Sequence, residues 1–355
     1  MKKLPAAIHE LLFRGTVIPA HPLALNDDLT IDEDRQKLLT RYYIACNAGG
    51  IAVGVHTTQF EIRDPRKNLL EPVLRIASEE VQNAKLERPF LKVAGICGST
   101  DVALKEAELA VKYDYHLGLL SNGGLSTYSE AQLIKRAEAV AAVIPLFGFY
   151  LQPAVGGRKL SYEFWRDFAE IPDVHAIKVA AFNRYQTLDV VRAVCNSSRR
   201  NEIALYTGND DNIIADLLTP HRFTIDGQEI EKRFTGGLLG HWAVWTKKAV
   251  ELLDEVKKCI ADNYAGVEAL LLKGVQVTDM NAAIFDAQHM YHGCISGIHE
   301  VLRQQGLLKN ILCLNPEENL SEGQAAEIER IIKAYPFLTD DDFVKAFIKV
   351  LPTPK

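Results

Sequence analysis

The sequence has 355 residues, 48% of them hydrophobic, which is enough for one large domain or for two smaller ones. A formal net charge of -6 argues against a nucleic-acid interface and against binding to an anionic membrane surface. The six cysteines are scattered, without CxxC or zinc-type spacing, so we expect reduced thiols in a cytoplasmic protein.

Short apolar strands alternate with helices along most of the chain. The predicted strands cover residues 16–20, 51–55, 90–96, 116–120, 145–151, 175–182, 203–207 and, more weakly, 236–239. The predicted helices between them cover residues 31–48, 66–85, 101–113, 129–143, 161–169 and 185–195. Strands that are apolar throughout are typical of a parallel sheet covered by helices, and eight such units favour a (β/α)8 barrel.

Two segments lie outside this alternation. Residues 220–234 form an insertion in which Asp226-Gly227 predicts the turn of a hairpin. The chain after the barrel is rich in helical patterns, which predicts a C-terminal helical region packed on the barrel. We therefore expect a barrel over residues 10–245 and the helical region over residues 246–355. No apolar stretch is long enough to span a bilayer, and the first residues lack the apolar core of a secretory signal.

Polar side chains gather at the C-terminal ends of the predicted strands, where barrel enzymes carry their chemistry. In chain order they are His56, Thr57, Thr58 and Gln59 after the second strand, Tyr150 and Gln152 at the fifth, Lys178 in the sixth, and Gly208, Asn209 and Asp210 after the seventh. They offer an amine nucleophile, a phenol for proton transfer, and hydroxyl and N–H groups for a carboxylate. These are the groups needed to bind a 2-oxo acid as an imine.

The interpretation depends on Lys178, which stands in the apolar stretch HAIKVAAF. An ammonium group is costly to bury, so a lysine in such surroundings tends to a lowered pKa, and its free amine can attack a carbonyl. The alternative is a lysine near a strand end whose ammonium reaches water. The other residues have structural alternatives as well: threonines cap helices, strand tyrosines fill cores, and Gly-Asn-Asp forms turns.

From about residue 13 to residue 332 the sequence resembles the dihydrodipicolinate synthase / N-acetylneuraminate lyase family of class I aldolases and lyases. Thr57-Thr58 stands where that family has Gly-Thr-Thr-Gly-Glu, and the stretch from Tyr150 to Pro153 resembles its Tyr-Asn-x-Pro motif. Ile177-Lys178 matches its Ile-Lys motif, and the stretch from Thr207 to Asp210 resembles its Ser-Gly-Asp-Asp.

The resemblance implies that Lys178 forms an imine with a 2-oxo acid, usually pyruvate, and that no cofactor is needed beyond this covalent link. It implies that Tyr150 shuttles the proton with Thr57 in the relay, and that Thr58 and nearby backbone N–H groups hold the substrate carboxylate. It also implies a homo-oligomer, a dimer or a tetramer.

Several positions depart from the family pattern. His56 replaces the glycine before the threonines, Gln59-Phe60 replaces the Gly-Glu after them, Asn122-Gly123-Gly124 replaces a pair of tyrosines, and Val155 replaces an arginine. These changes argue against the lysine-biosynthesis reaction with aspartate semialdehyde. With Gln152, Gly208 and Asn209, the new residues His56 and Gln59 predict contacts to a different, polar second substrate.

Three other functions remain open at this point. The chain could be a 4-hydroxy-tetrahydrodipicolinate synthase proper, or a non-catalytic barrel that binds a small carboxylate or a protein partner. A metal-dependent class II aldolase is disfavoured because the histidines lack clustered ligand spacing, His289 and His292 being the one close pair. We accordingly expect no metal site.

Overall fold

The computed structural model describes residues 3–350, in which eight strands of one sheet alternate with helices. This is the (β/α)8 TIM barrel that the sequence predicts, followed by C-terminal helices. The chain forms two compact units. Unit 1 consists of the chain up to Thr16 together with residues 89–239, and unit 2 consists of residues 17–88 together with the chain from Gly240 onward.

Unit 1 contains six of the barrel strands, each parallel to the next. In spatial order they are β3 (Leu91–Ile96), β4 (Leu117–Leu120), β5 (Leu146–Leu151), β6 (Val174–Ala180), β7 (Ala204–Thr207) and β10 (Phe234–Leu239). The helices of the unit are α1 (Ala6–Arg14), α4 (Thr100–Lys112), α5 (Glu130–Ala141), α6 (Tyr162–Ala169), α7 (Arg184–Asn196) and α8 (Ile213–Leu218). Side-chain caps begin three of them, because Ser129, Ser161 and Asn183 each accept a bond from a first-turn N–H.

The sheet of unit 1 has a helix face and an inner face. A Cβ on Gly148 would collide with the Phe168 ring of α6, so Gly148 points to the helix face. Because side chains alternate along a strand, Phe149 then points to the inner face and Tyr150 to the helix face. Parallel neighbours in register share a face, which lets the alternation be followed from strand to strand.

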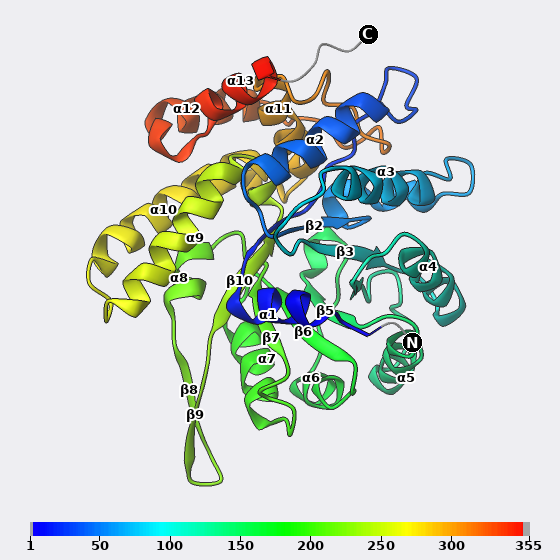
Figure 1. Ribbon diagram of the computed structural model, residues 1–355, viewed down its shortest axis with the longest axis vertical. Coiled ribbons are helices and arrows are strands. Elements are labelled where there is room, and N and C mark those ends of the chain that lie inside the picture. The colour runs from blue at the N-terminus through cyan, green and yellow to red at the C-terminus, as the bar shows by residue number, and fades with distance from the viewer. Residues whose placement is uncertain (1–2, 351–355) are drawn as a thin grey trace. The chain divides into compact units, whose positions relative to one another are not determined.

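The insertion between α8 and β10 is a two-stranded antiparallel hairpin, as predicted. It consists of β8 (His221–Ile225) and β9 (Gln228–Lys232), and it extends beyond the helices of unit 1 (Figure 1). Asp226 and Gly227 at its tip both have positive φ, at 51° and 77°, which is the backbone of a type I′ turn.

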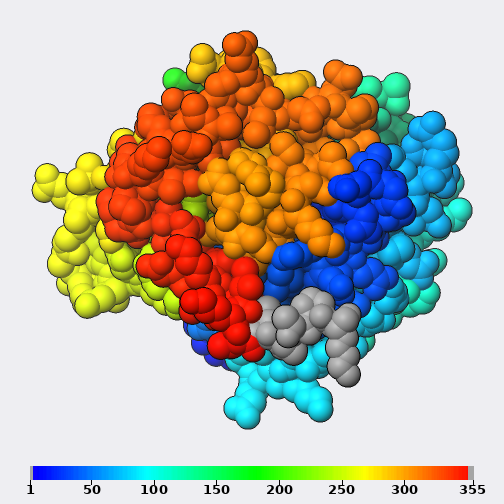
Figure 2. All heavy atoms as spheres, turned by 90° about the horizontal axis from the view of Figure 1, so that it is seen from above, coloured from blue at the N-terminus to red at the C-terminus, as the bar shows by residue number. Residues whose placement is uncertain are grey.

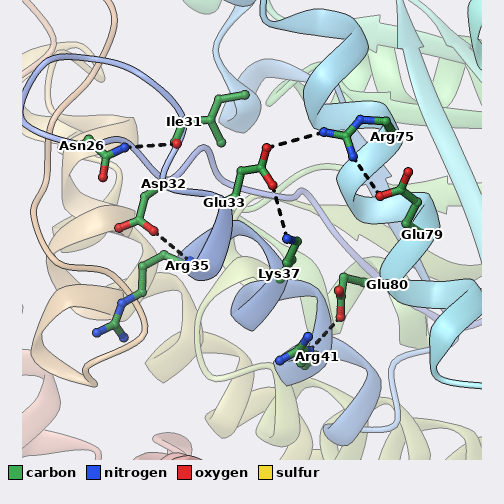
Figure 3. A network of polar contacts seen from close by, with 10 residues as sticks. All are labelled: Asn26, Ile31, Asp32, Glu33, Arg35, Lys37, Arg41, Arg75, Glu79 and Glu80. Carbon is green, nitrogen blue, oxygen red and sulfur yellow. Dashed lines mark hydrogen bonds and ion pairs between the residues drawn. The ribbon is translucent and has the colours of Figure 1, made fainter. Parts of the chain in front are cut away.

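Unit 2 contains the first two barrel strands, β1 (Val17–Pro19) and β2 (Gly50–Val53), with a parallel bridge between Ala20 and Ala52. Its helices are α2 (Glu33–Ala45), α3 (Leu70–Asn83), α9 (Thr246–Ala261), α10 (Val267–Ile284), α11 (Cys294–Gln304), α12 (Gln324–Ala334) and α13 (Asp341–Val350). Ion pairs link α2 to α3, where Arg41 contacts Glu80 and Arg75 contacts Glu33, and Arg75 also contacts Glu79 within α3 (Figure 3). The pairs involving Arg75 are largely exposed, so they add little stability.

The C-terminal helix α13 lies beside α2 (Figure 2), and a buried polar contact fixes it there. The Tyr42 hydroxyl donates to Asp340 Oδ2 at 2.6 Å and accepts from the Thr246 N–H at 2.9 Å. Tyr43 of the same helix donates to the Ala243 carbonyl at 3.0 Å. The last helices therefore pack with the first barrel strands and α2, so the compact units do not follow the boundary expected between residues 245 and 246.

Among residues 3–350, none of the helices combines the length and the apolar content that crossing a bilayer requires.

Candidate active site

Lys178 lies in the middle of three strands, on the inner face of the sheet in unit 1. The register aligns Phe149 of β5, Lys178 of β6 and Tyr206 of β7 side by side, so their side chains share one face. The neighbouring Ile177 contacts the Cβ position of Gly148 on the helix face, which confirms that Lys178 points the other way. The alternation therefore places the Lys178 side chain on the inner face.

The Lys178 side chain is 7% exposed and has mainly apolar neighbours. Its Nζ lies 4.5 Å from the centroid of the Phe149 ring. Burial lowers the pKa of Lys178 from 10.5 to about 8, because an ammonium group loses its hydration there, and the charge of Asp210 opposes this lowering. The ring quadrupole of Phe149 also favours the cation. At pH 7 the amine is still mostly charged, but the lowered pKa makes its neutral form, which attacks a carbonyl, far more populated than in a solvent-exposed lysine.

Gly208, the residue after β7, leaves the space that the Lys178 side chain fills. A Cβ at this position would stand 2.4 Å from Lys178 Cε and 2.9 Å from the Ala180 Cβ. The backbone N–H of Gly208 donates to the Val179 carbonyl at 2.7 Å. The predicted substrate-binding role of Gly208 stays a prediction, while the structure gives it a positioning role.

The expected pairing of Lys178 with the Tyr150 phenol is wrong. Tyr150 is in register with Val179 and points to the helix face, where its ring lies 5.3 Å from that of Trp165 in α6. Its hydroxyl accepts from the Leu160 N–H at 3.3 Å and lies 3.5 Å from the Leu160 carbonyl. The motif match identifies the strand next to Lys178. The pleat of that strand directs the Tyr150 side chain away from the amine, and the Phe149 ring lies beside the amine instead.

We expect Tyr150→Phe to leave the chemistry of Lys178 almost unchanged. The hydroxyl supports the Leu160 backbone, so its loss should cost about 1 kcal/mol of unfolding free energy. Chemical denaturation measures this loss, and borohydride trapping of a 2-oxo acid measures adduct formation at Lys178. A fall of about 100-fold or more in the trapping rate, as loss of a proton-transfer group produces, would contradict the placement of this ring.

Asn209 is held by structural hydrogen bonds. Its Oδ1 accepts from the Phe182 N–H at 3.0 Å, and its Nδ2 donates to Asp216 Oδ2 at 2.8 Å and to Thr187 Oγ1 at 3.3 Å. Both N–H groups of the side chain are used in these bonds, and its predicted binding role stays a prediction. Asp216, which sequence reasoning missed, is the centre of this network and also accepts from the Thr207 hydroxyl at 2.7 Å.

Arg136 and Asn122 are a second pair that sequence reasoning did not connect. Arg136 of α5 is 1% exposed, and it donates to the Gly98 carbonyl at 2.9 Å and contacts Asn122 Oδ1 at 3.4 Å. The contact orients the carboxamide of Asn122, which follows β4. An arginine in the predicted helix over residues 129–143 gives no signal of its own, because only the fold brings it into contact with Gly98 and Asn122.

Gln152 follows β5 and is 8% exposed. Its N–H donates to the Ala180 carbonyl at 3.0 Å, which places it beside the end of β6. It remains a predicted contact to substrate, and its position is compatible with that role.

In unit 2 the Thr57-Thr58 pair lies in a 3-10 turn over His56–Thr58 that follows β2. The Thr58 hydroxyl donates to the His21 carbonyl at 2.7 Å and accepts from the N–H groups of Gly54 and Val55 at 3.0 and 3.3 Å. A hydroxyl offers one donor and two acceptor positions, and all are used. The hydroxyl of Thr58 therefore fixes this loop, and its predicted contact with a carboxylate stays a prediction.

Thr57 is 3% exposed, and its Oγ1 lies 3.6 Å from the position of a Cβ on Gly240, also in unit 2. The ring of His56 stands edge-on to Phe60 with 5.8 Å between the centroids. The predicted roles of both residues stay predictions.

Gln59 occupies a backbone conformation that favours glycine, with φ of 70°. The family resembled by this sequence has glycine there, so the sequence held a signal of this geometry. Gln59 Oε1 accepts from the Leu314 N–H at 2.6 Å, while Nε2 is buried and bonds to none of the described residues. The two N–H donors of the Gln59 side chain therefore have no hydrogen-bond partner among the described residues, and its predicted contact with a substrate stays a prediction.

No family model matches the sequence, and no curated protein matches it. Solved structures do match. Dihydrodipicolinate synthase from Oceanobacillus iheyensis has a TM-score of 0.72 at 16% identity, covering 93% of this chain and 99% of that one. N-acetylneuraminate lyase from Fusobacterium nucleatum, complexed with pyruvate, has a TM-score of 0.70 at 16% identity, covering 91% and 98%. CdNal from Clostridium difficile, in complex with mannosamine, has a TM-score of 0.68 at 14% identity, covering 90% and 99%.

The chain shares the fold of these enzymes. The match covers nearly the whole of each neighbour, so the barrel and the helices after it belong to one shared architecture. At this level of identity each site residue has to be judged by its own geometry. Lys178 lies buried on the inner face, Tyr150 lies on the helix face, and the side chains of Thr58 and Asn209 are held in structural hydrogen bonds.

Proposed function

We propose that the chain is a Schiff-base-forming lyase that acts on a 2-oxo acid of the pyruvate type. The observation that carries the proposal is the enclosed amine of Lys178, which has a pKa lowered to about 8 and lies on the inner face between Phe149 and Gly208. A lysine in a structural ion pair does not need a lowered pKa, whereas a nucleophilic lysine needs surroundings that favour its neutral amine. The lysine itself carries the covalent chemistry, so the proposal includes no cofactor.

The amine attacks the carbonyl carbon of the acid, and loss of water leaves an imine. When protonated, the imine withdraws electrons from the neighbouring carbon, which permits a C–C bond to break or to form, or a hydroxyl group to leave. The proposal therefore covers aldol cleavage, condensation and dehydration of a sugar-acid-like substrate. The fold neighbours support this class, since two of them are named as a dihydrodipicolinate synthase and an N-acetylneuraminate lyase, the latter complexed with pyruvate.

The second substrate is proposed to differ from that of the synthases. Asn122-Gly123-Gly124 stands where tyrosines are expected, and the Asn122 carboxamide is oriented by Arg136. Gln152 follows β5 and Asn122 follows β4, and both polar residues are almost completely buried. They fit a substrate rich in hydroxyl groups better than an aldehyde of aspartate.

The test is a trapping screen in which the protein is reduced with borohydride in the presence of different 2-oxo acids. We expect a mass increase at Lys178 with at least one acid, loss of this increase in Lys178→Met, and its retention in Lys92→Met. Lys92 is a suitable control because it is also buried but its Nζ donates to the Tyr113 carbonyl. Failure of every acid to form an adduct would reject the lyase.

A non-catalytic barrel that binds a small carboxylate is the second candidate. The observation in its favour is that the Tyr150 hydroxyl, expected to shuttle a proton, and the Thr58 hydroxyl, expected to bind the carboxylate, are held in structural bonds. This function predicts that binding of an acid survives Lys178→Arg and that no 2-oxo acid is turned over. Isothermal titration of that variant with pyruvate separates the two functions.

A further inference from the structure

The carboxylate of Asp216 in α8 binds four side chains, and each of its oxygens serves a different pair. Oδ2 accepts from the Thr207 hydroxyl at 2.7 Å and from Asn209 Nδ2 at 2.8 Å. Oδ1 accepts from Asn212 Nδ2 at 3.0 Å and forms an ion pair with Arg184 of α7. Asp216 is 2% exposed, and a charge buried to that degree needs such donors.

The bonds of Oδ1 hold two helices together. Asn212 stands directly before α8, and its carbonyl also accepts from the Asp216 N–H at 3.0 Å. Arg184 is the first residue of α7, and its side chain is 44% exposed, so its ion pair is partly screened by solvent. This half of the carboxylate therefore joins the first turns of α7 and α8.

The bonds of Oδ2 fix the backbone on both sides of Gly208. Thr207 and Asn209 are the two neighbours of this glycine, and the Asn209 N–H donates to Thr207 Oγ1 at 3.2 Å. Gly208 is the residue against which the Lys178 side chain lies, since a Cβ there would stand 2.4 Å from Lys178 Cε. A movement of this turn would therefore change the space that the amine occupies.

The same network closes the end of β6, the strand that carries Lys178. Asn209 Oδ1 accepts from the N–H of Phe182, two residues after the strand, at 3.0 Å. Phe182 has a φ of 48°, a conformation that a residue with a Cβ adopts only when its surroundings hold it there. On its other side the Lys178 amine faces the Phe149 ring, 4.5 Å from the centroid. The flexible lysine thus lies between a ring and a turn that Asp216 holds.

We propose that Asp216 is a positioning residue for the Lys178 amine and acts through the turn at Gly208; this rests on the proposed lyase function. Oδ2 is the oxygen that performs this role, because its two partners enclose the glycine. Without it the turn can move and the lysine stem gains room. The amine then spends less time where it can attack a carbonyl, and a displacement of about 1 Å lowers such a rate by about 100-fold.

Two other roles for Asp216 make different predictions. A purely structural role predicts a lower free energy of unfolding and an unchanged rate of imine formation in the folded protein. A role through charge predicts a shift in the pH at which the rate rises, because loss of a nearby negative charge lowers the pKa of an amine. Positioning predicts a lower rate at every pH, with the midpoint of the pH profile unchanged.

The experiment measures the rate at which full-length protein forms an imine with pyruvate between pH 7 and pH 10. Timed samples are quenched with excess borohydride, and the adduct at Lys178 is measured by mass spectrometry. We expect Asp216→Ala to be slower by about 100-fold and Thr207→Val by about 10-fold, both with the wild-type midpoint. Asp216→Asn should keep most of the rate, because its amide oxygen can still accept from Thr207 and Asn209.

Two control variants separate positioning from loss of stability, which denaturant unfolding measures for each protein. Arg184→Met removes a partner of Oδ1 only, and it should react like wild type. Asp340→Asn changes a buried carboxylate of unit 2 that also accepts several bonds, from Tyr42, Lys247 and Gln305. It should lower the free energy of unfolding without slowing imine formation.

Each outcome supports or overturns the inference. If wild type reacts and Thr207→Val reacts at the same rate, the inference is overturned while the lyase stands; this variant decides the test even if Asp216→Ala does not fold. A slower rate with a shifted midpoint would assign Asp216 a role through charge. An equal loss of rate in Asp340→Asn would trace the effect to stability, and either result overturns positioning. If wild type forms no adduct with pyruvate or any other 2-oxo acid, both proposals fall together.

Discussion

The unfolding free energy of the wild-type protein is expected to rise by about 3 kcal/mol relative to Lys178→Met between pH 8 and pH 10.5. The folded state loses the proton of Lys178 near pH 8, whereas the unfolded chain keeps it up to its ordinary value of 10.5. Between these two values the unfolded state binds more protons, so raising the pH stabilises the folded state. Below pH 8 both states are charged and the difference between the two proteins should be flat.

Denaturant unfolding of both proteins at several pH values across this window measures the effect. Lys232 has a pKa lowered to about 8 as well, but it is present in both proteins and its contribution cancels in the difference. The two proteins also differ at neutral pH, because removing the amine leaves Asp210 without its opposite charge. A difference that stays constant from neutral to alkaline pH would show that the amine is hydrated, and would remove the basis of the proposed chemistry.

The sequence predicted the barrel well because its signals are local and repeated. Each apolar strand is bounded by turn residues or caps, and the Asp226-Gly227 turn has the backbone that its residues favour. Helix α1 was missed, since its stretch before the first strand was considered only as a possible targeting segment. The division into compact units was also out of reach, because it depends on contacts such as Tyr42 with Asp340, distant in sequence.

The candidate site was predictable in part, and the limit is the pleat of one strand. Motif spacing identified Lys178 and placed Tyr150 on the neighbouring strand. It could not decide which of Phe149 and Tyr150 faces the amine, because a shift of register by one residue reverses every side chain. The structure has such an irregularity at the start of the β5–β6 pairing, between Leu146 and Phe147. A motif match without the strand register therefore identifies β5 correctly, but it selects the ring of Tyr150 where the ring of Phe149 faces the amine.

Hydroxyl and amide groups pose a related problem. Thr58 and Asn209 are the residue types that bind carboxylates, and the same types fix loops. Their hydrogen-bond partners, the His21 carbonyl and Asp216, come from segments that no local pattern connects to them. Gln59 is different, since a glutamine where glycine is expected signals backbone strain, and strain of this kind is found at functional loops.

A single methyl group at Gly208 should nearly abolish imine formation while leaving the barrel folded. In Gly208→Ala the new Cβ would stand 2.4 Å from Lys178 Cε and 3.0 Å from Cγ, so the lysine has to move. The side chain is flexible and will yield before the strand does, which displaces the amine by about 1 Å or more and should lower the trapping rate by about 100-fold. The Ala180 Cβ, at 2.9 Å, limits how far the new methyl can turn aside.

A double-mutant cycle separates this positioning effect from a general loss of stability. The cost of Gly208→Ala in unfolding free energy is measured in wild type and in Lys178→Ala, where the colliding atoms are absent. We expect the cost to fall in the Lys178→Ala background, because only the contact with Ala180 remains. An equal cost in both backgrounds, with an unchanged trapping rate in the single variant, would mean that Lys178 does not run over Gly208. The glycine after β7 would then serve the turn, and the buried amine would owe its position to Phe149 and the register of β6 alone.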